Sequence, residues 1–163
     1  MEAICPNSYL KIEKAVDEMK KIVVDSSVIV KWLNREDEMY LEKADKVLSD
    51  AQNKKVRLIA PSLARYEVGN ALLKKDLNLP AAFDSLGTAY NLPVSFVSET
   101  EDLAFESYEM AKAAKDSGNI KVTYYDTAFI ALAKQEEATL VTDNPKHQEK
   151  IKGVKVIPLK DYK

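Results

Sequence analysis

Apolar and polar residues follow one another along this chain in a pattern that predicts strands separated by helices. Short apolar runs, many of them β-branched, predict buried strands at residues 22–24, 56–60, 94–97, 139–142 and 154–157. Between these runs, apolar residues recur at three- and four-residue steps and predict helices at 28–33, 40–51, 61–72, 81–90, 99–117 and 123–136. The alternation predicts the α/β class, with three α/β/α layers and a central, mostly parallel sheet of four to five strands.

Local signals locate some of the helix ends. Pro61 suits the first turn of the helix that follows the second strand. Ser98 and Glu101 predict a capping box at the start of the long helix, and Gly118 predicts the end of that helix.

Length and composition indicate one ordinary globular domain. The chain has 163 residues, of which 46% are hydrophobic and 31% charged, as is usual for such a domain. We expect residues 1–18 to form an N-terminal helical extension and residues 19–163 to form the domain. Apolar runs stay well below the ~18 residues that span a bilayer, and the N-terminus lacks a signal-peptide core. We therefore expect a cytoplasmic protein with no membrane partner. The net charge of −2 gives no overall nucleic-acid signature.

One carboxylate interrupts the first apolar run at its end. Asp25 follows the predicted strand at 22–24 and precedes a further apolar segment. In an open parallel sheet, ligands bind just beyond the carboxyl ends of the strands, so Asp25 is a candidate ligand. Its alternative role is to cap the helix that follows.

A glutamate also lies on an apolar helix face. Glu67 is four residues from both Leu63 and Ala71, so all three share one side of the helix. Glu is almost never buried without a partner, which makes Glu67 a second candidate. The alternative is a salt bridge to Arg65 or Lys74 at the edge of the core.

Two further aspartates occupy comparable places later in the chain. Asp126 shares a helix face with Phe129 and Ile130, although Thr123 and Asp126 also match the two ends of a capping box. Asp143 directly follows the strand at 139–142 and is itself followed by Asn144 and a proline, so a plain turn is the alternative there.

Taken together, the four acidic positions predict a cation site. Four ionised carboxylates in one pocket repel each other unless their pKa values rise or cations bind between them. Ligand sets made only of oxygen favour Mg²⁺ or Mn²⁺. The chain offers one histidine and one cysteine in all, which agrees with an oxygen-only site.

Four segments resemble the PIN-domain family and are most similar to its small ribonucleases of the VapC toxin type. They are Val23-Val24-Asp25-Ser26-Ser27-Val28-Ile29-Val30-Lys31-Trp32, Pro61-Ser62-Leu63-Ala64-Arg65-Tyr66-Glu67-Val68-Gly69-Asn70-Ala71-Leu72, Tyr125-Asp126-Thr127-Ala128 and Leu140-Val141-Thr142-Asp143-Asn144. The similarity extends from about Lys20 to Tyr162 in the family's motif order, and residues 1–18 have no counterpart.

This resemblance implies a Mg²⁺- or Mn²⁺-dependent endoribonuclease that acts on RNA, forms a homodimer and is held inactive by an antitoxin protein. Asp25, Glu67 and Asp126 match the best-defined acidic positions, and Ser27 matches a hydroxyl that steadies the first of them. The fourth position falls on Asp143 or Asn144. We prefer Asp143 as the charged ligand, with Asn144 and Thr142 in support.

Substrate contacts and alternative functions follow from the same reading. The candidates for contact with RNA are Lys31, Arg65, Lys74 and Lys121, with Tyr124 as a residue that could stack on a base. The alternatives are a PIN-type nuclease that matures RNA or cuts structured DNA, and a catalytically silent PIN scaffold for protein association.

Overall fold

The computed structural model describes residues 19–146 and 148–163. The predicted helical extension at residues 1–18 lies outside this range. The described elements, in chain order, are β1 (Lys20–Val24), α2 (Ser26–Leu33), α3 (Leu41–Gln52), β2 (Val56–Pro61), α4 (Leu63–Lys74), α5 (Leu79–Asn91), β3 (Val94–Val97), α6 (Glu101–Asp116), α7 (Tyr124–Gln135), β4 (Thr139–Thr142), β5 (Val156–Pro158) and the 3-10 turn η1 (Leu159–Asp161).

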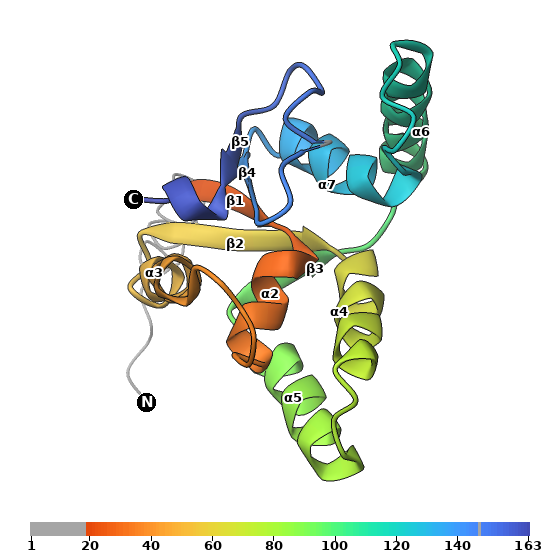
Figure 1. Cartoon of the computed structure of the whole chain (residues 1–163). Helices are drawn as coiled ribbons and strands as arrows, with labels where there is room; N and C mark the ends of the chain where they lie inside the picture. Colours follow the sequence, from red (N-terminus) through yellow and green to blue (C-terminus); the bar gives the residue numbers. More distant parts are fainter. Residues whose placement is uncertain (1–18, 147) are drawn as a thin grey trace, which may run out of the picture.

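The five strands form one parallel sheet in the order β3-β2-β1-β4-β5, which confirms the predicted fold class (Figure 1). β1 is central, and its Val23 lies opposite Ile59 of β2 and Leu140 of β4. The β-branched residues of β1 are almost fully buried, with Val23 and Val24 at 0% exposure. A strand covered on both faces has no polar side, which explains the unbroken apolar run in the sequence.

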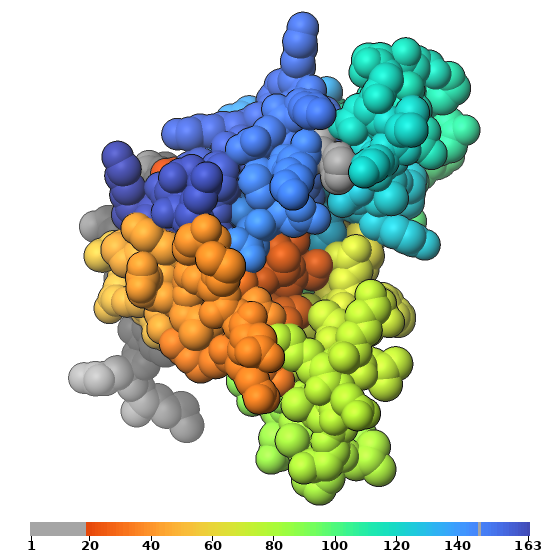
Figure 2. Space-filling model, viewed as in Figure 1, coloured from red at the N-terminus to blue at the C-terminus, as the bar shows by residue number. Residues whose placement is uncertain are grey.

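Helices cover both faces of this sheet. α2 and α3 pack against one face, and α7 packs against β1, β2 and β4 on the other. α4 and α5 pack against α2, while α6 packs against α7 (Figure 1). The α4–α5 pair projects from the body of the molecule at the lower end of the view in Figure 2. In the described part of the chain, no helix combines the length and apolar character needed to cross a bilayer.

Two of the local signals for helix starts, Pro61 and Ser98, are wrong, and each has a physical reason. Pro61 is the last residue of β2 rather than a helical residue, and it lies opposite Val97 of β3. β1 accompanies β2 only as far as Ile59, so Pro61 lies where the strand has a single neighbour and its missing N–H is tolerated. The long helix α6 is capped by Thr100 instead of Ser98, because the Thr100 side chain accepts a hydrogen bond from Leu103 N.

The strand order fixes where a ligand can bind. From β1 the chain moves outward to β2 and β3, then returns to the opposite side of β1 to form β4 and β5. Ligands of open parallel sheets bind at such a reversal, beyond the carboxyl ends of the strands. The reversal lies between β1 and β4, where Asp25 N donates a 3.0 Å hydrogen bond to Val141 O.

Candidate active site

Asp25 occupies the reversal point and is 8% exposed. It is the N-cap of α2, and its Oδ1 accepts a hydrogen bond of 2.8 Å from Ser27 N. Its Oδ2 accepts a second bond of 3.0 Å from Gln148 Nε2. The capping role considered for Asp25 is therefore present, and two donors fix the plane of its carboxylate.

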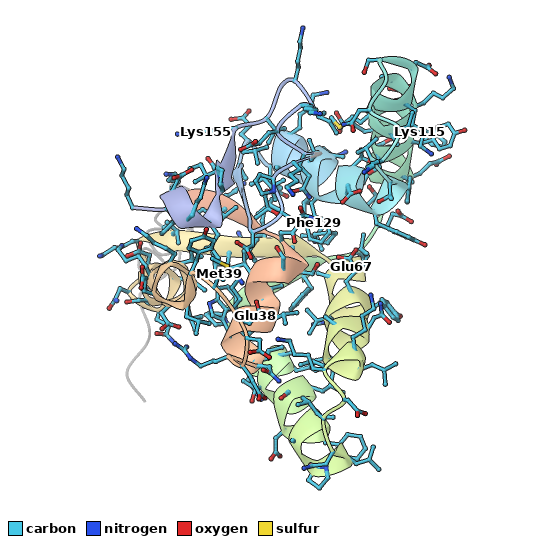
Figure 3. All side chains as sticks on the ribbon, in the orientation of Figure 1. Glu38, Met39, Glu67, Lys115, Phe129 and Lys155 are labelled. Atoms are coloured by element: carbon cyan, nitrogen blue, oxygen red, sulfur yellow. The ribbon has the colours of Figure 1, made fainter. Side chains whose placement is uncertain are left out.

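Glu67 projects from α4 toward the start of α2, near Phe129 of α7 (Figure 3). Its Oε2 accepts a 2.7 Å hydrogen bond from Ser26 Oγ. Burial raises the pKa of the Glu67 carboxyl, the Ser26 bond opposes this, and the negative charges of Asp25 and Asp126 raise it further. A salt bridge to Arg65 was one alternative considered for Glu67. In the described structure the Arg65 guanidinium instead lies 4.2 Å from the centre of the Phe96 ring.

Asp126 lies in the first turn of α7 and completes a capping box with Thr123. Its Oδ2 accepts hydrogen bonds from Thr123 N at 2.8 Å and from Thr123 Oγ1 at 2.7 Å. The predicted capping box is confirmed. Because these bonds end on one carboxylate oxygen, the other oxygen remains available to a ligand.

These three carboxylates line a single cavity of about 290 Å³. Its other polar walls come from Ser26, Ser27, Asn144 and Gln148, and its apolar walls from Val30, Ala71 and Phe129. Three helices (α2 with its N-cap residue, α4 and α7) and the segment after β4 therefore supply oxygen atoms to one pocket at the carboxyl edge of the sheet.

The structure does not bring Asp143 into this pocket. Asp143 Oδ2 lies 2.9 Å from Lys31 Nζ, and Asp143 N donates to Ser27 Oγ at 3.1 Å. The next residue, Asn144, lines the pocket instead, and its backbone N–H donates to Thr142 Oγ1 at 3.1 Å. Ser27 therefore supports the site through its N–H to Asp25 and through its hydroxyl to the backbone of Asp143.

A buried ammonium holds Asp143 in place. Lys31 is 1% exposed, and its Nζ also lies 2.7 Å from Glu38, which in turn lies 2.7 Å from Lys75. Burial lowers the pKa of Lys31, but the hydrogen bonds and attraction from Glu38 and Asp143 outweigh burial and raise it. For Glu38, burial raises the pKa, and the two lysines outweigh it and lower the pKa. The Lys31 ammonium therefore stabilises the fold through its two ion pairs, and Lys31 does not line the pocket.

A second cavity, of about 690 Å³, adjoins the first and shares Ser27, Val30 and Ala71 with it. Among its lining residues are Glu38, Lys74, Lys75 and Asp143. Of the predicted substrate contacts, Lys74 thus lies one cavity away from the carboxylates. Lys121 is exposed, and Tyr124 OH donates to Glu99 Oε1 at 2.5 Å.

Two exposed tyrosines flank Glu67 on its other side. A cavity of about 440 Å³ is lined by Leu63, Tyr66, Glu67, Asn70 and Tyr125. Tyr66 is 82% exposed and Tyr125 is 60% exposed. Large apolar rings in water beside a polar pocket are typical of a binding surface.

Sequence reasoning missed two members of the site, Ser26 and Gln148. Ser26 was adjacent to the Asp25 motif, and only the approach of α4 shows that its hydroxyl serves Glu67. Gln148 is 2% exposed although it lies in a turn-rich polar segment. Nothing in that segment signals burial, because its contact with Asp25 spans 123 positions.

The donor set fits a hydrated Mg²⁺ or Mn²⁺ ion. Over residues 19–146 and 148–163, no three Asp, Glu, His or Cys side chains are close enough to hold one ion together. Mg²⁺ usually binds one or two carboxylates directly and keeps several of its waters, and the cavity leaves room for water between its oxygen atoms. Gln148 Oε1, a buried oxygen with no hydrogen-bond partner in the described structure, adds an acceptor to this wall.

Comparisons with known proteins agree on the fold. A model of the PIN domain matches residues 22–153. VapBC2 from Rickettsia felis, bound to a DNA fragment from its promoter, superposes with a TM-score of 0.67 at 16% identity, covering 85% of this chain and 98% of that one. FitAcB from Neisseria gonorrhoeae superposes with a TM-score of 0.64 at 17% identity, covering 85% of this chain and 97% of that one. VapC20 from Mycobacterium tuberculosis, a sarcin-ricin loop cleaving toxin, superposes with a TM-score of 0.60 at 14% identity, covering 78% of this chain and 93% of that one. The search of curated proteins gave no match.

Proposed function

The chain belongs to the PIN domain family, and from that premise we propose that it is a Mg²⁺- or Mn²⁺-dependent endoribonuclease, the toxin of a toxin–antitoxin pair. The observation that carries this proposal is the convergence of Asp25, Glu67 and Asp126 on one cavity at the carboxyl edge of the sheet. Such an oxygen-lined pocket suits the hydrolysis of a phosphodiester, in which negative charge develops on phosphate oxygens.

Asp25 and Asp126 hold the cation, with Asn144 as the fourth side of the pocket in preference to Asp143. When bound, the cation lowers the pKa of a nearby water and offsets the charge on the phosphate. Glu67 orients the attacking water, and its raised pKa brings its proton affinity closer to neutral pH, as suits a group that handles a proton. The water gives a proton to Glu67 as its oxygen bonds to phosphorus, the bond to the leaving ribose oxygen breaks, and that oxygen takes up a proton from solvent.

The substrate is single-stranded or looped RNA. Tyr66 and Tyr125 flank Glu67 with exposed rings, and unstacked bases bind to exposed aromatic rings at ~1–3 kcal/mol per base. One structural neighbour is a sarcin-ricin loop cleaving toxin, which supports an RNA substrate of this kind. Tyr125 takes the role that was predicted for its neighbour Tyr124, whose hydroxyl is bound to Glu99.

The antitoxin covers the projecting α4–α5 pair. The α4–α5 surface carries exposed large apolar side chains, namely Tyr66, Leu73, Leu79, Phe83 and Tyr90, and exposed apolar patches mark sites of interaction with other proteins. One structural neighbour is a toxin–antitoxin complex from Klebsiella pneumoniae. Because Tyr66 belongs to both surfaces, a protein seated on α4–α5 also blocks the entrance to the pocket. Homodimer formation remains an expectation from the resemblance, to be measured by light scattering.

The test is cleavage of a panel of single-stranded, looped and duplex nucleic acids by the purified chain. We expect the chain to cleave RNA with Mg²⁺ or Mn²⁺ and not with EDTA. In Asp126→Asn we expect the rate of RNA cleavage to fall at least ~100-fold. Asp102→Asn is the matched control, because Asp102 lies in the first turn of α6 as Asp126 does in α7 but is exposed and is not among the residues that line the pocket.

Each outcome discriminates between functions. Cleavage of DNA but not RNA favours the alternative nuclease, and cation binding without cleavage of any substrate favours the silent scaffold. If Asp126→Asn cuts RNA at the wild-type rate, the site assignment is wrong.

A further inference from the structure

Gln148 is a polar side chain buried beside the candidate metal ligands. It is 2% exposed and lines the same cavity as Asp25, Glu67 and Asp126. It reaches Asp25 from the segment after β4, and its Nε2 donates a 3.0 Å hydrogen bond to Asp25 Oδ2.

The partner of Nε2 determines which way the amide faces. An ionised carboxylate only accepts hydrogen bonds, so the NH₂ end of Gln148 must face Asp25 and the oxygen must point elsewhere. That oxygen, Oε1, has no hydrogen-bond partner in the described structure. A buried acceptor without a donor is costly, and native structures keep such groups where a water, an ion or a function supplies the missing contact.

None of the surrounding groups donates a hydrogen bond to Oε1 in the described structure. The nearby hydroxyl of Ser26 donates to Glu67, Asp25 is itself an acceptor, and the hydroxyl of Ser27 accepts a bond from Asp143 N. The remaining walls of the cavity are carboxylates, the Asn144 amide and apolar side chains. Water molecules that hydrate a cation carry strongly polarised O–H groups, and they are well matched to a lone carboxamide oxygen.

We propose that Gln148 is a positioning residue for the cation, with Nε2 fixing the carboxylate of Asp25 and Oε1 accepting a hydrogen bond from the hydration shell of Mg²⁺ or Mn²⁺. The inference rests on the proposed metal site and deepens it. It assigns Gln148 to the layer of residues that orient metal ligands, whose loss typically costs ~10–100-fold in metal affinity.

The test measures Mn²⁺ binding by calorimetry and by the electron paramagnetic resonance signal of free Mn²⁺, without any substrate. Gln148→Met keeps the length of the side chain and removes both polar ends. We expect its dissociation constant for Mn²⁺ to rise at least ~10-fold, measured at a temperature at which the metal-free variant is fully folded. Gln52→Met, at the exposed end of α3, is the matched control and should bind Mn²⁺ as the wild type does.

A second variant separates the two ends of the amide. Gln148→Glu keeps an oxygen in the place of Oε1 and loses the donor to Asp25. We expect it to bind Mn²⁺ more tightly than Gln148→Met does, with a larger rise in melting temperature on adding Mn²⁺. If Gln148→Glu binds as weakly as Gln148→Met, the role of Oε1 is overturned.

The remaining outcomes keep this inference apart from the proposed function. Wild-type affinity for Mn²⁺ in Gln148→Met means that Gln148 only fills space, and it overturns the inference whether or not the chain cuts RNA. A wild-type chain that binds no Mn²⁺ overturns it as well. A wild-type chain that binds Mn²⁺ and cuts no RNA overturns the proposed function alone, because the comparison of the Gln148 variants still stands.

Discussion

Replacing Lys31 by methionine removes a buried charge that ties three segments together. The Lys31 ammonium contacts Glu38 at 2.7 Å and Asp143 at 2.9 Å, and its side chain is 2% exposed. Methionine fits the same volume, so the substitution leaves the packing in place and removes only the ion pairs. The two carboxylates that remain are 19% and 25% exposed, which limits how well water can replace the lost partner.

The size of the effect follows from those surroundings. Removing one member of a buried ion pair costs ~3–5 kcal/mol. Glu38 keeps a second partner, Lys75, at 2.7 Å, so we expect the lower end, about 3 kcal/mol of unfolding free energy. For a chain of this length, that loss lowers the melting temperature by ~6–12 °C.

The pH dependence of this loss has a definite sign. The pKa of Lys31 is raised in the folded chain, so its contribution is complete below about pH 10 and is lost only as the pH rises further. The pKa of Glu38 is lowered, so its contribution is present above about pH 4 and disappears as the pH falls through the folded value. The difference between wild type and Lys31→Met should therefore be flat from about pH 6 to 9 and shrink below about pH 4.

Urea unfolding of both chains across this pH range is the assay. Lys112→Met is the control, because Lys112 pairs with Asp116 on an exposed helix surface, where such pairs contribute ~0.3–0.5 kcal/mol. If Lys31→Met unfolds within 0.5 kcal/mol of the wild type at pH 7 (roughly the size of that surface effect), or if its loss persists undiminished at about pH 3, the ion-pair reasoning is wrong.

Three further predictions address the pocket. Glu67→Gln should make the metal-free chain more stable at pH 7, because the raised pKa of Glu67 means that its ionised form opposes folding. The gain, measured by urea unfolding, should vanish below about pH 4. A variant less stable than wild type at pH 7 would contradict the cost assigned to burial of the Glu67 charge and to its repulsion by Asp25 and Asp126. Mn²⁺ at about 100 times its dissociation constant should stabilise the wild type by ~2.7 kcal/mol, EDTA should reverse this, and Asp25→Asn should show no such gain in a thermal scan. Tyr66→Ala should weaken RNA binding by ~1–3 kcal/mol in a fluorescence titration, while Tyr108→Ala, equally aromatic and 64% exposed on α6, should bind as the wild type does.

Most of the fold can be predicted from the sequence, because the apolar runs that mark the strands are a local pattern. The strands at Val94–Val97 and Thr139–Thr142 begin and end where the apolar runs predict. The same local signals explain Asp25 and Asp126, each of which caps a helix and lines the pocket. Capping and cavity-lining roles are compatible because a carboxylate has two oxygens, so the alternatives weighed from the sequence were not exclusive.

The fourth side of the pocket could not be predicted, because contacts distant in sequence decide it. Asp143 and Asn144 are neighbours on a turn, and a local pattern cannot tell which of them faces the pocket. Lys31, more than a hundred residues earlier, binds Asp143 and so leaves Asn144 at the cavity wall. The burial of Gln148 is hidden for the same reason, since its partner Asp25 belongs to the first strand-to-helix turn.

The pairing of β1 with β4 also bears on when the activity arises during synthesis. Val141 and Gln148, which bind Asp25, follow it by more than a hundred residues and are therefore synthesised well after it. Domains form as their chains emerge from the N-terminus onward, and a strand pair so far apart in sequence closes late. A nascent chain that has not yet released β4 therefore lacks the wall that completes the pocket. The pocket proposed for RNA cleavage is therefore complete only once β4 and the segment that carries Gln148 have been made.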